Sequence, residues 1–183
     1  MVELIPLMFA LVTVFYIVAT LAYLAFVIKP NDIVGRIGHW FVAAGFVIHL
    51  AVVLIRYFAG GYTPITNLHE SFSFFALATA GAFIIFERSY RLTILGSFVM
   101  PIALVLLMAS RTFPMDIGAL NPALKSGWLV IHTVVAFLGY ATFAIAFGAG
   151  IMYLLQEHFL KQKRFGSLYQ RLPSLDTLDD INY

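Results

Sequence analysis

The sequence predicts an all-α protein, a polytopic membrane bundle of about five transmembrane helices. Of its 183 residues, 62% are hydrophobic and only 11% are charged. In a soluble domain roughly a quarter of all residues are charged. The apolar residues occur in blocks that are long enough to cross, as helices, a hydrocarbon core of about 30 Å. These blocks are continuous, and half-buried β-strands would instead show alternation of apolar and polar residues.

The expected spans, in chain order, are Leu4–Ile28, Ile37–Phe58, Leu68–Phe86, Leu92–Ala109 and Trp128–Gln156. The first has no basic region before it and is too long for a signal-peptide core, which indicates an uncleaved span. The third contains Ser71, Ser73 and Thr79 and is the least apolar. The fourth contains Pro101, which should kink it or free a backbone carbonyl. Residues 1–157 are therefore expected to form the bundle, and residues 158–183 a polar cytoplasmic segment.

The basic residues predict the orientation of the bundle, because cytoplasmic loops carry an excess of Lys and Arg. With the N-terminus outside, the segments on the inner side contain Lys29, Arg36, Arg88, Arg91, Lys161, Lys163, Arg164 and Arg171. The segments on the outer side contain only Arg56, Arg111 and Lys125. We therefore expect an outer N-terminus and a cytoplasmic C-terminal tail.

Composition also excludes several functions. The net charge of +2 gives no argument for nucleic acid as a partner. The chain has no cysteine, which excludes disulfides, thiolate metal sites and thiol redox chemistry within it. A metal ion would have to be held by histidine, methionine, carboxylates or a cofactor.

The stretch YTPITNLHESFSFF places polar residues where a loop becomes the third helix. Asn67 is expected to cap the helix, and Glu70 to return a hydrogen bond to the backbone of the cap. A carboxylate is also favoured there by the positive end of the helix dipole. A second role for this turn, in shaping a pocket in the outer leaflet, stays open.

His132 lies in the stretch SGWLVIHTVVAFLGY, one helical turn after Trp128 and among apolar neighbours. A neutral imidazole near the membrane interface can serve as an axial ligand of haem iron. The alternative is a hydrogen bond from the imidazole to a loop carbonyl. Spacing alone does not decide between them.

Two further ionisable residues lie in the second span. His49 is a functional candidate because ionisable groups inside a bilayer are costly, and its alternative is a hydrogen bond between helices. Arg56 is expected to extend to the outer headgroups, or alternatively to meet a haem propionate. His39 and His158 are expected to be interfacial and solvated, and we assign no role to them.

The segments GFVIHLAVVLIRYFAGGYTPITNLHESFSFFA and ALKSGWLVIHTVVAFLGYATFAIAFGAGIMYLLQ resemble the CcsA/ResC family of cytochrome c assembly proteins. These are the haem-handling membrane subunits of the route called system II. The resemblance covers nearly the whole chain from the second span onwards. It rests on three motifs in a fixed order, namely H-x6-R, P-x2-N-L-x-E-S and W-L-x2-H.

The resemblance implies that haem b is presented, not permanently held, at the outer face of the membrane for covalent attachment to apocytochrome c. It implies a ResB-type membrane partner and a location in the cytoplasmic membrane or a thylakoid membrane. His132 matches the first of two external histidines that bind haem iron. The candidate cofactor-binding residues are His132, His49, Trp128, Arg56, Asn67 and Glu70. His69 departs from the family pattern, which more often has tyrosine there.

The chain lacks the tryptophan-rich signature of the family, its flanking spans and the second external histidine. We therefore expect an N-terminal fragment that cannot attach haem alone, although the complete assembly would be a haem lyase. Two alternatives stay open. One is a membrane anchor of the b-type cytochrome kind, which needs two histidines on facing spans. The other is a structural or transport bundle whose histidines only make helix contacts.

Overall fold

The computed structural model describes residues 2–117, 126–163, 165–166 and 168–182. Regular structure in these ranges is helical throughout, without a strand. The α-helices are α1 (Ile5–Ile28), α2 (Asp32–Gly60), α3 (Leu68–Tyr90), α4 (Gly96–Ser110), α5 (Gly127–Lys161) and α6 (Leu175–Asn182). Short 3₁₀ turns lie at Val2–Leu4, Thr93–Leu95 and Tyr169–Arg171. The predicted all-α class is confirmed.

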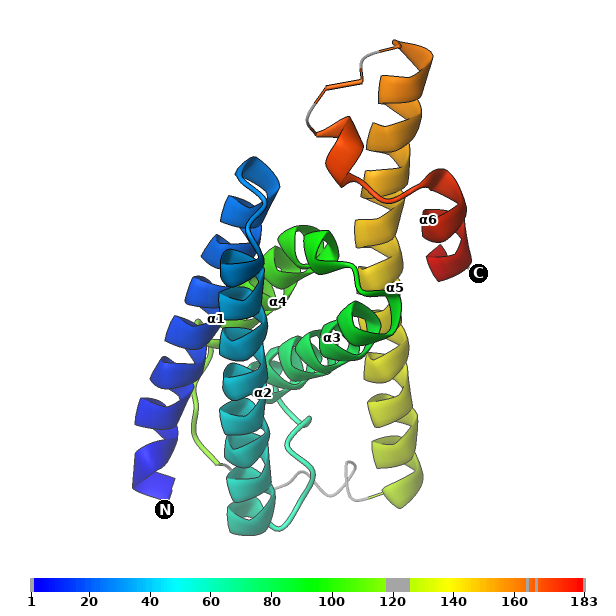
Figure 1. Cartoon of the computed structure of the whole chain (residues 1–183). Helices are drawn as coiled ribbons and strands as arrows, with labels where there is room; N and C mark the ends of the chain where they lie inside the picture. The colour runs from blue at the N-terminus through cyan, green and yellow to red at the C-terminus, as the bar shows by residue number, and fades with distance from the viewer. Residues whose placement is uncertain (1, 118–125, 164, 167, 183) are drawn as a thin grey trace.

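Five of the described helices are long and apolar enough to cross a membrane. Figure 1 shows α1 and α2 side by side, with α3 and α4 crossing obliquely between this pair and α5. The last helix, α6, folds back against α5. The predicted polytopic bundle is therefore confirmed, as a multi-pass membrane protein.

Several helices run further than the apolar blocks predict, because their ends have local stop and start signals. The side chain of Asn31 accepts a hydrogen bond of 2.8 Å from the backbone of Ile33, so α2 begins at Asp32. It ends at Gly60, and the C-cap residue Gly61 has a φ of 68°, the left-handed conformation that closes many helices. Pro101 lies inside α4, and the helix continues through it.

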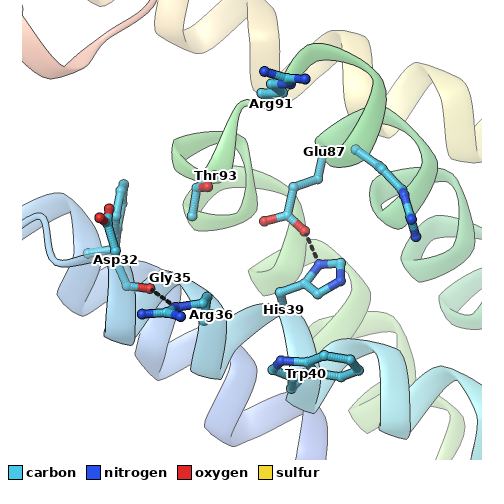
Figure 2. A pocket seen from close by; sticks show the side chains of 10 residues that line it. Asp32, Gly35, Arg36, His39, Trp40, Glu87, Arg91 and Thr93 are labelled. Carbon is cyan, nitrogen blue, oxygen red and sulfur yellow. Dashed lines mark hydrogen bonds and ion pairs between the residues drawn. The ribbon is translucent and has the colours of Figure 1, made fainter.

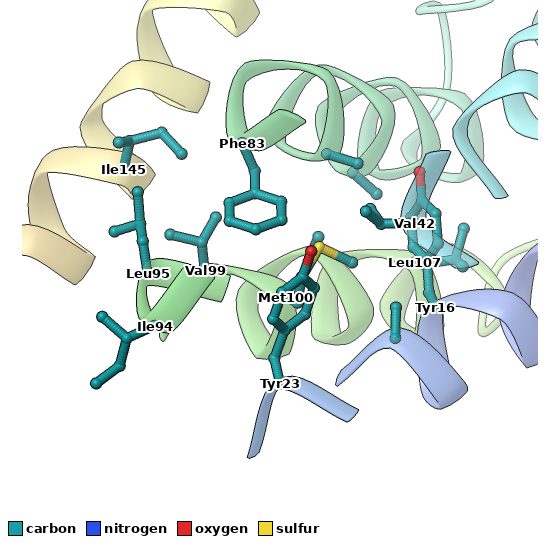
Figure 3. Packing of buried hydrophobic residues seen from close by; sticks show 14 of the residues in the cluster. Tyr16, Tyr23, Val42, Phe83, Ile94, Leu95, Val99, Met100, Leu107 and Ile145 are labelled. Carbon is teal, nitrogen blue, oxygen red and sulfur yellow. The ribbon is translucent and has the colours of Figure 1, made fainter. Parts of the chain in front are cut away.

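The core lies where α1, α3 and α4 meet, and Figure 3 shows its large side chains. Tyr23, Phe83 and Leu95 are fully buried there. Gly96 lets α4 approach closely, because a Cβ atom at this position would lie 2.6 Å from the ring of Tyr23. The core thus fixes α4 against α1 by a contact that only glycine permits without a shift.

The described residues after α5 also pack against the bundle. Leu172, Leu178 and Ile181 are buried, the last two on α6 where it packs against α5. Arg171 donates hydrogen bonds to the carbonyls of Val27 and Ile28, at the end of α1. The segment predicted to be polar therefore has an apolar face, and α5 itself continues past residue 157 to Lys161.

Candidate functional site

Arg56 and Glu70 join α2 to α3 at one end of the bundle. Nη2 of Arg56 donates to Oε1 of Glu70 at 2.9 Å, and Nη1 donates to the carbonyl of Met115 at 2.8 Å. The arginine is buried, so the prediction that it extends to the headgroups is wrong. The carboxylate of Glu70 on the neighbouring helix neutralises this charge and offsets the cost of removing the guanidinium from water.

The turn that starts α3 is organised around Glu70. Oδ1 of Asn67 accepts from the backbone nitrogen of Glu70 at 2.9 Å, which confirms Asn67 as the helix cap. Oε2 of Glu70 accepts from the backbone nitrogen of Thr66 at 2.9 Å and from its hydroxyl at 2.8 Å. The returning bond therefore reaches one residue before the cap, and not the cap itself as predicted. The carboxylate holds the loop between α2 and α3 to both helices.

Tyr62 completes the contacts of this carboxylate, since its hydroxyl donates to Oε1 of Glu70 at 3.4 Å. Burial raises the pKa of Tyr62, and the negative charge of Glu70 raises it further. The phenol therefore keeps its proton, and its role as a donor, to a higher pH than an isolated tyrosine does.

His49 is fully buried between three helices. Its Nε2 lies 2.9 Å from Oγ of Ser73 on α3, and its Nδ1 lies 3.4 Å from the hydroxyl of Tyr16 on α1. These contacts match the alternative in which His49 hydrogen-bonds between helices. Any haem contact by His49 would require one of these hydrogen bonds to break.

His69 is also buried, and its Nδ1–H donates to the carbonyl of Ser110 at the end of α4, at 2.9 Å. Phe9 packs between the two buried histidines, with ring centroids 5.2 Å from His69 and 5.8 Å from His49. A b-type cytochrome needs a porphyrin between two such rings, and here both rings instead contact the fully buried side chain of Phe9. The packing around this pair does not fit a haem held between His49 and His69.

His132 and Trp128 lie apart from these clusters, on the first half of α5. Both are exposed, Trp128 to 77%. Within the described ranges His132 has no hydrogen-bonding partner, and the loop residues 118–125, which could supply a carbonyl, lie outside them. Among the described residues, then, the imidazole of His132 is unpartnered on a helix surface, one turn after an exposed indole.

A small cavity of about 140 Å³ connects α5 with the Glu70 network. It is lined by Ile65 and Thr66 from the loop and by Leu129, Val130 and Thr133 from α5. It is too small for a porphyrin. The cavity shows that the loop lies next to α5. Thr66, which is hydrogen-bonded to Glu70, borders the same turn of α5 that carries His132.

A second polar cluster, which sequence reasoning missed, lies at the opposite end of the bundle. Glu87 on α3 is buried; it accepts from the hydroxyl of Tyr23 at 2.9 Å and from Nδ1 of His39 at 2.8 Å. His39 had been assigned no role. The available signal was Glu87 itself, since an acid at the end of an apolar helix needs a partner.

Five apolar helices with ionisable groups paired in their interior define the class, a multi-pass helical membrane protein. Residues 65–183 match the family described as Cytochrome C assembly protein. The chain belongs to this family, which confirms the resemblance found in the sequence.

Individual relatives agree with this assignment. The chain is 33% identical over 147 residues to Cytochrome c biogenesis protein CcsA of Guillardia theta, covering 70% of this chain and 49% of the relative. It is 36% identical over 108 residues to the protein of that name from Synechocystis, covering 57% and 32%. Protein HemX of Brevibacillus brevis is 28% identical over 169 residues, covering 92% and 62%. The chain thus spans only about a third to three fifths of these relatives.

Proposed function

We propose that this chain is the part of a cytochrome c biogenesis protein that presents haem b for covalent attachment to apocytochrome c. Haem is the cargo, and His132 is its axial ligand. The supporting observations are membership of the cytochrome c assembly family and the exposed imidazole on α5, which has no partner among the residues that the structure describes. The site faces the outer side of a cytoplasmic or thylakoid membrane, as the distribution of basic residues predicts.

The exposure of the His132 imidazole on α5 is the observation that carries the proposal. In the described residues there is no group of three or more His, Cys, Asp or Glu side chains that could hold a bare metal ion. Iron in a porphyrin needs only an axial ligand from the protein, because the macrocycle supplies four nitrogens. Trp128 lies on the same face of α5, one turn away, and its exposed indole offers a flat apolar surface next to the ring.

We assign indirect roles to His49, Arg56, Asn67 and Glu70, which the family resemblance placed among the haem-binding residues. Glu70 binds Arg56, Thr66 and the helix cap, and Thr66 borders the α5 turn that carries His132. His49 fixes α2 between α1 and α3. In this role they position the α5 surface without contacting the porphyrin.

The chemistry assigned to the chain is binding and orientation. A thioether forms when the S–H of an apocytochrome cysteine adds across a haem vinyl group, so the reacting thiols belong to the substrate. A chain without cysteine is compatible with that division of labour. A ResB-type partner, together with the part of the relatives that this chain does not cover, would enclose the exposed surface of α5.

The test is the haem content of the full-length protein purified with single substitutions on α5. We expect His132→Ala to lose most of the bound haem, measured from the pyridine haemochrome spectrum, and added imidazole to restore it. His158→Ala is the matched control, since His158 is an exposed histidine on the same helix. Equal haem content in the two variants would remove His132 as a ligand and favour a structural bundle.

A further inference from the structure

A cavity of about 850 Å³ opens at the end of the bundle opposite the Glu70 network. Figure 2 shows it between the start of α2, the end of α3 and the turn at Thr93. Its lining includes the cations Arg36, Arg88 and Arg91 and the aromatic residues Phe26 and Trp40. This volume lies in the range of ligand sites, about 300–1,000 Å³.

Three arginines and two carboxylates line the cavity, which leaves it a net formal charge of +1 when His39 is neutral. Both oxygens of Glu87 are engaged, one by Tyr23 and one by His39, as Figure 2 shows for the latter. Asp32, the other acid, is the first residue of α2, where the helix dipole favours a carboxylate.

The guanidinium groups, in contrast, keep free donors. Arg36 uses its Nε to donate to the carbonyl of Asp32 at 3.3 Å, so its two terminal NH₂ groups remain available. Arg88 and Arg91 are exposed, and neither has a hydrogen-bonding or ion-pair partner among the residues that the structure describes. Three guanidinium groups around one cavity form a site that suits an oxyanion.

The backbone at Arg91 gives an independent observation. Its φ is 55°, in the left-handed region, at the C-cap of α3. Glycine is preferred at such caps, because a side chain there is strained. Strain that persists at a functional surface is a reason to look for a role of the strained residue. Here the strained residue carries a free cation on the wall of the cavity.

We propose that this cavity binds a phosphate group through Arg88, Arg91 and the terminal NH₂ groups of Arg36. Two sources share that chemistry, namely an anionic phospholipid of the bilayer and a free phosphate from the aqueous phase. The apolar part of a lipid would lie against Trp40, which is 69% exposed, and Phe26. Basic pockets near the cytoplasmic ends of membrane helices are suited to such headgroups, and tryptophan is enriched at that depth.

The experiment uses the full chain in nanodiscs of phosphatidylcholine, into which phosphatidylglycerol is titrated while bound lipid is counted by native mass spectrometry. We expect phosphatidylglycerol to bind in preference to phosphatidylcholine and its affinity to fall with salt. The decisive variant is Arg91→Gly, because glycine suits the left-handed cap and keeps the fold. Its affinity for phosphatidylglycerol should fall about fivefold, the effect of one basic residue near an anionic surface.

Arg88→Gln is the second variant and should weaken binding to a similar extent. Lys161→Gln is the control, since Lys161 is an exposed cation that already pairs with Glu157 outside the cavity, and it should leave affinity unchanged. Displacement of the lipid by millimolar inorganic phosphate would identify the aqueous source for the same site. Equal affinity of wild type and both arginine variants, or equal binding of the two lipids, would overturn the proposal. Neither result depends on haem content, so it is separable from the role of His132.

Discussion

Arg56 of α2 and Glu70 of α3 form an ion pair whose side chains are only 4% and 1% exposed. It lies at the end of the bundle where the α2–α3 loop meets α5. A charge pair so far from water contributes to the fold chiefly by matching the two helices to each other, since each charge is costly without the other.

Removing one partner should therefore be severe. Glu70→Ala leaves the guanidinium of Arg56 buried without its carboxylate and should lower the free energy of unfolding by about 3–5 kcal/mol. Denaturant unfolding in detergent micelles measures the loss. Glu157→Ala, in the exposed pair with Lys161, is the control and should cost below about 0.5 kcal/mol. Comparable losses in both variants would contradict the role of burial.

The helix cap makes a smaller, separable contribution. Asn67→Ala removes the acceptor for the backbone nitrogen of Glu70 and should destabilise the protein by about 1 kcal/mol. Asn67→Ser keeps a capping oxygen and should retain most of the stability. The same unfolding assay decides, and an Asn67→Ser variant as unstable as Asn67→Ala would show that capping is not the cause.

The two hydrogen bonds of His49 differ in length, so their removal should differ in cost. Ser73→Ala leaves Nε2 of the buried imidazole unpaired and should cost about 1 kcal/mol. Tyr16→Phe removes the contact of 3.4 Å, which is weak, and should cost less. Thermal unfolding of the two variants in parallel tests this order. A larger loss of stability in Tyr16→Phe than in Ser73→Ala would contradict it.

Any side chain at position 96 should destabilise the protein. In Gly96→Ala the new methyl group would lie 2.6 Å from the ring of Tyr23 and 2.8 Å from Phe83, and overpacking of this kind costs about 1–3 kcal/mol. Gly139→Ala is the control, since nothing lies within 4 Å of its new methyl group and helix propensity favours alanine. The melting temperature should fall for the first variant only.

The phenol of Tyr62 should titrate above the ordinary tyrosine pKa of about 10. Because its pKa is raised in the folded protein, its contribution to stability is complete below pH 10 and is lost as the pH rises further. The difference in absorbance at the phenolate band between wild type and Tyr62→Phe follows this group alone. A transition of that difference signal at or below pH 10 would contradict the contact with Glu70.

The fold was largely predictable, because long apolar blocks allow few alternatives to membrane helices. The extensions of α2 and α5 beyond those blocks were not predictable from hydropathy. An average over apolar residues detects neither the N-cap at Asn31 nor the polar last turn of α5, which continues to Lys161. The same limit concealed α6. Its sequence is polar on average, and only the folded chain shows that Leu178 and Ile181 face α5.

The candidate site was predictable in part. Asn67 was recognised as a cap because that signal is local. The ion pair of Arg56 was not predicted, because its partner Glu70 lies on another helix. Spacing along the sequence does not give the distance between side chains on two different helices. The pairing of His39 with Glu87 was missed for the same reason.

The unequal lengths of α4 and α5 have a consequence for the surrounding lipid. With the 3₁₀ turn before it, α4 forms a span of 18 residues, Thr93–Ser110. At about 1.5–2 Å per residue this span is about 28 Å long, close to a hydrocarbon core of about 30 Å, whereas the 35 residues of α5 extend about 52 Å. The excess length of α5 must be accommodated by tilting or by extending into water at the membrane surface. Acyl-chain length should therefore alter the stability of this protein even where headgroup charge is held constant.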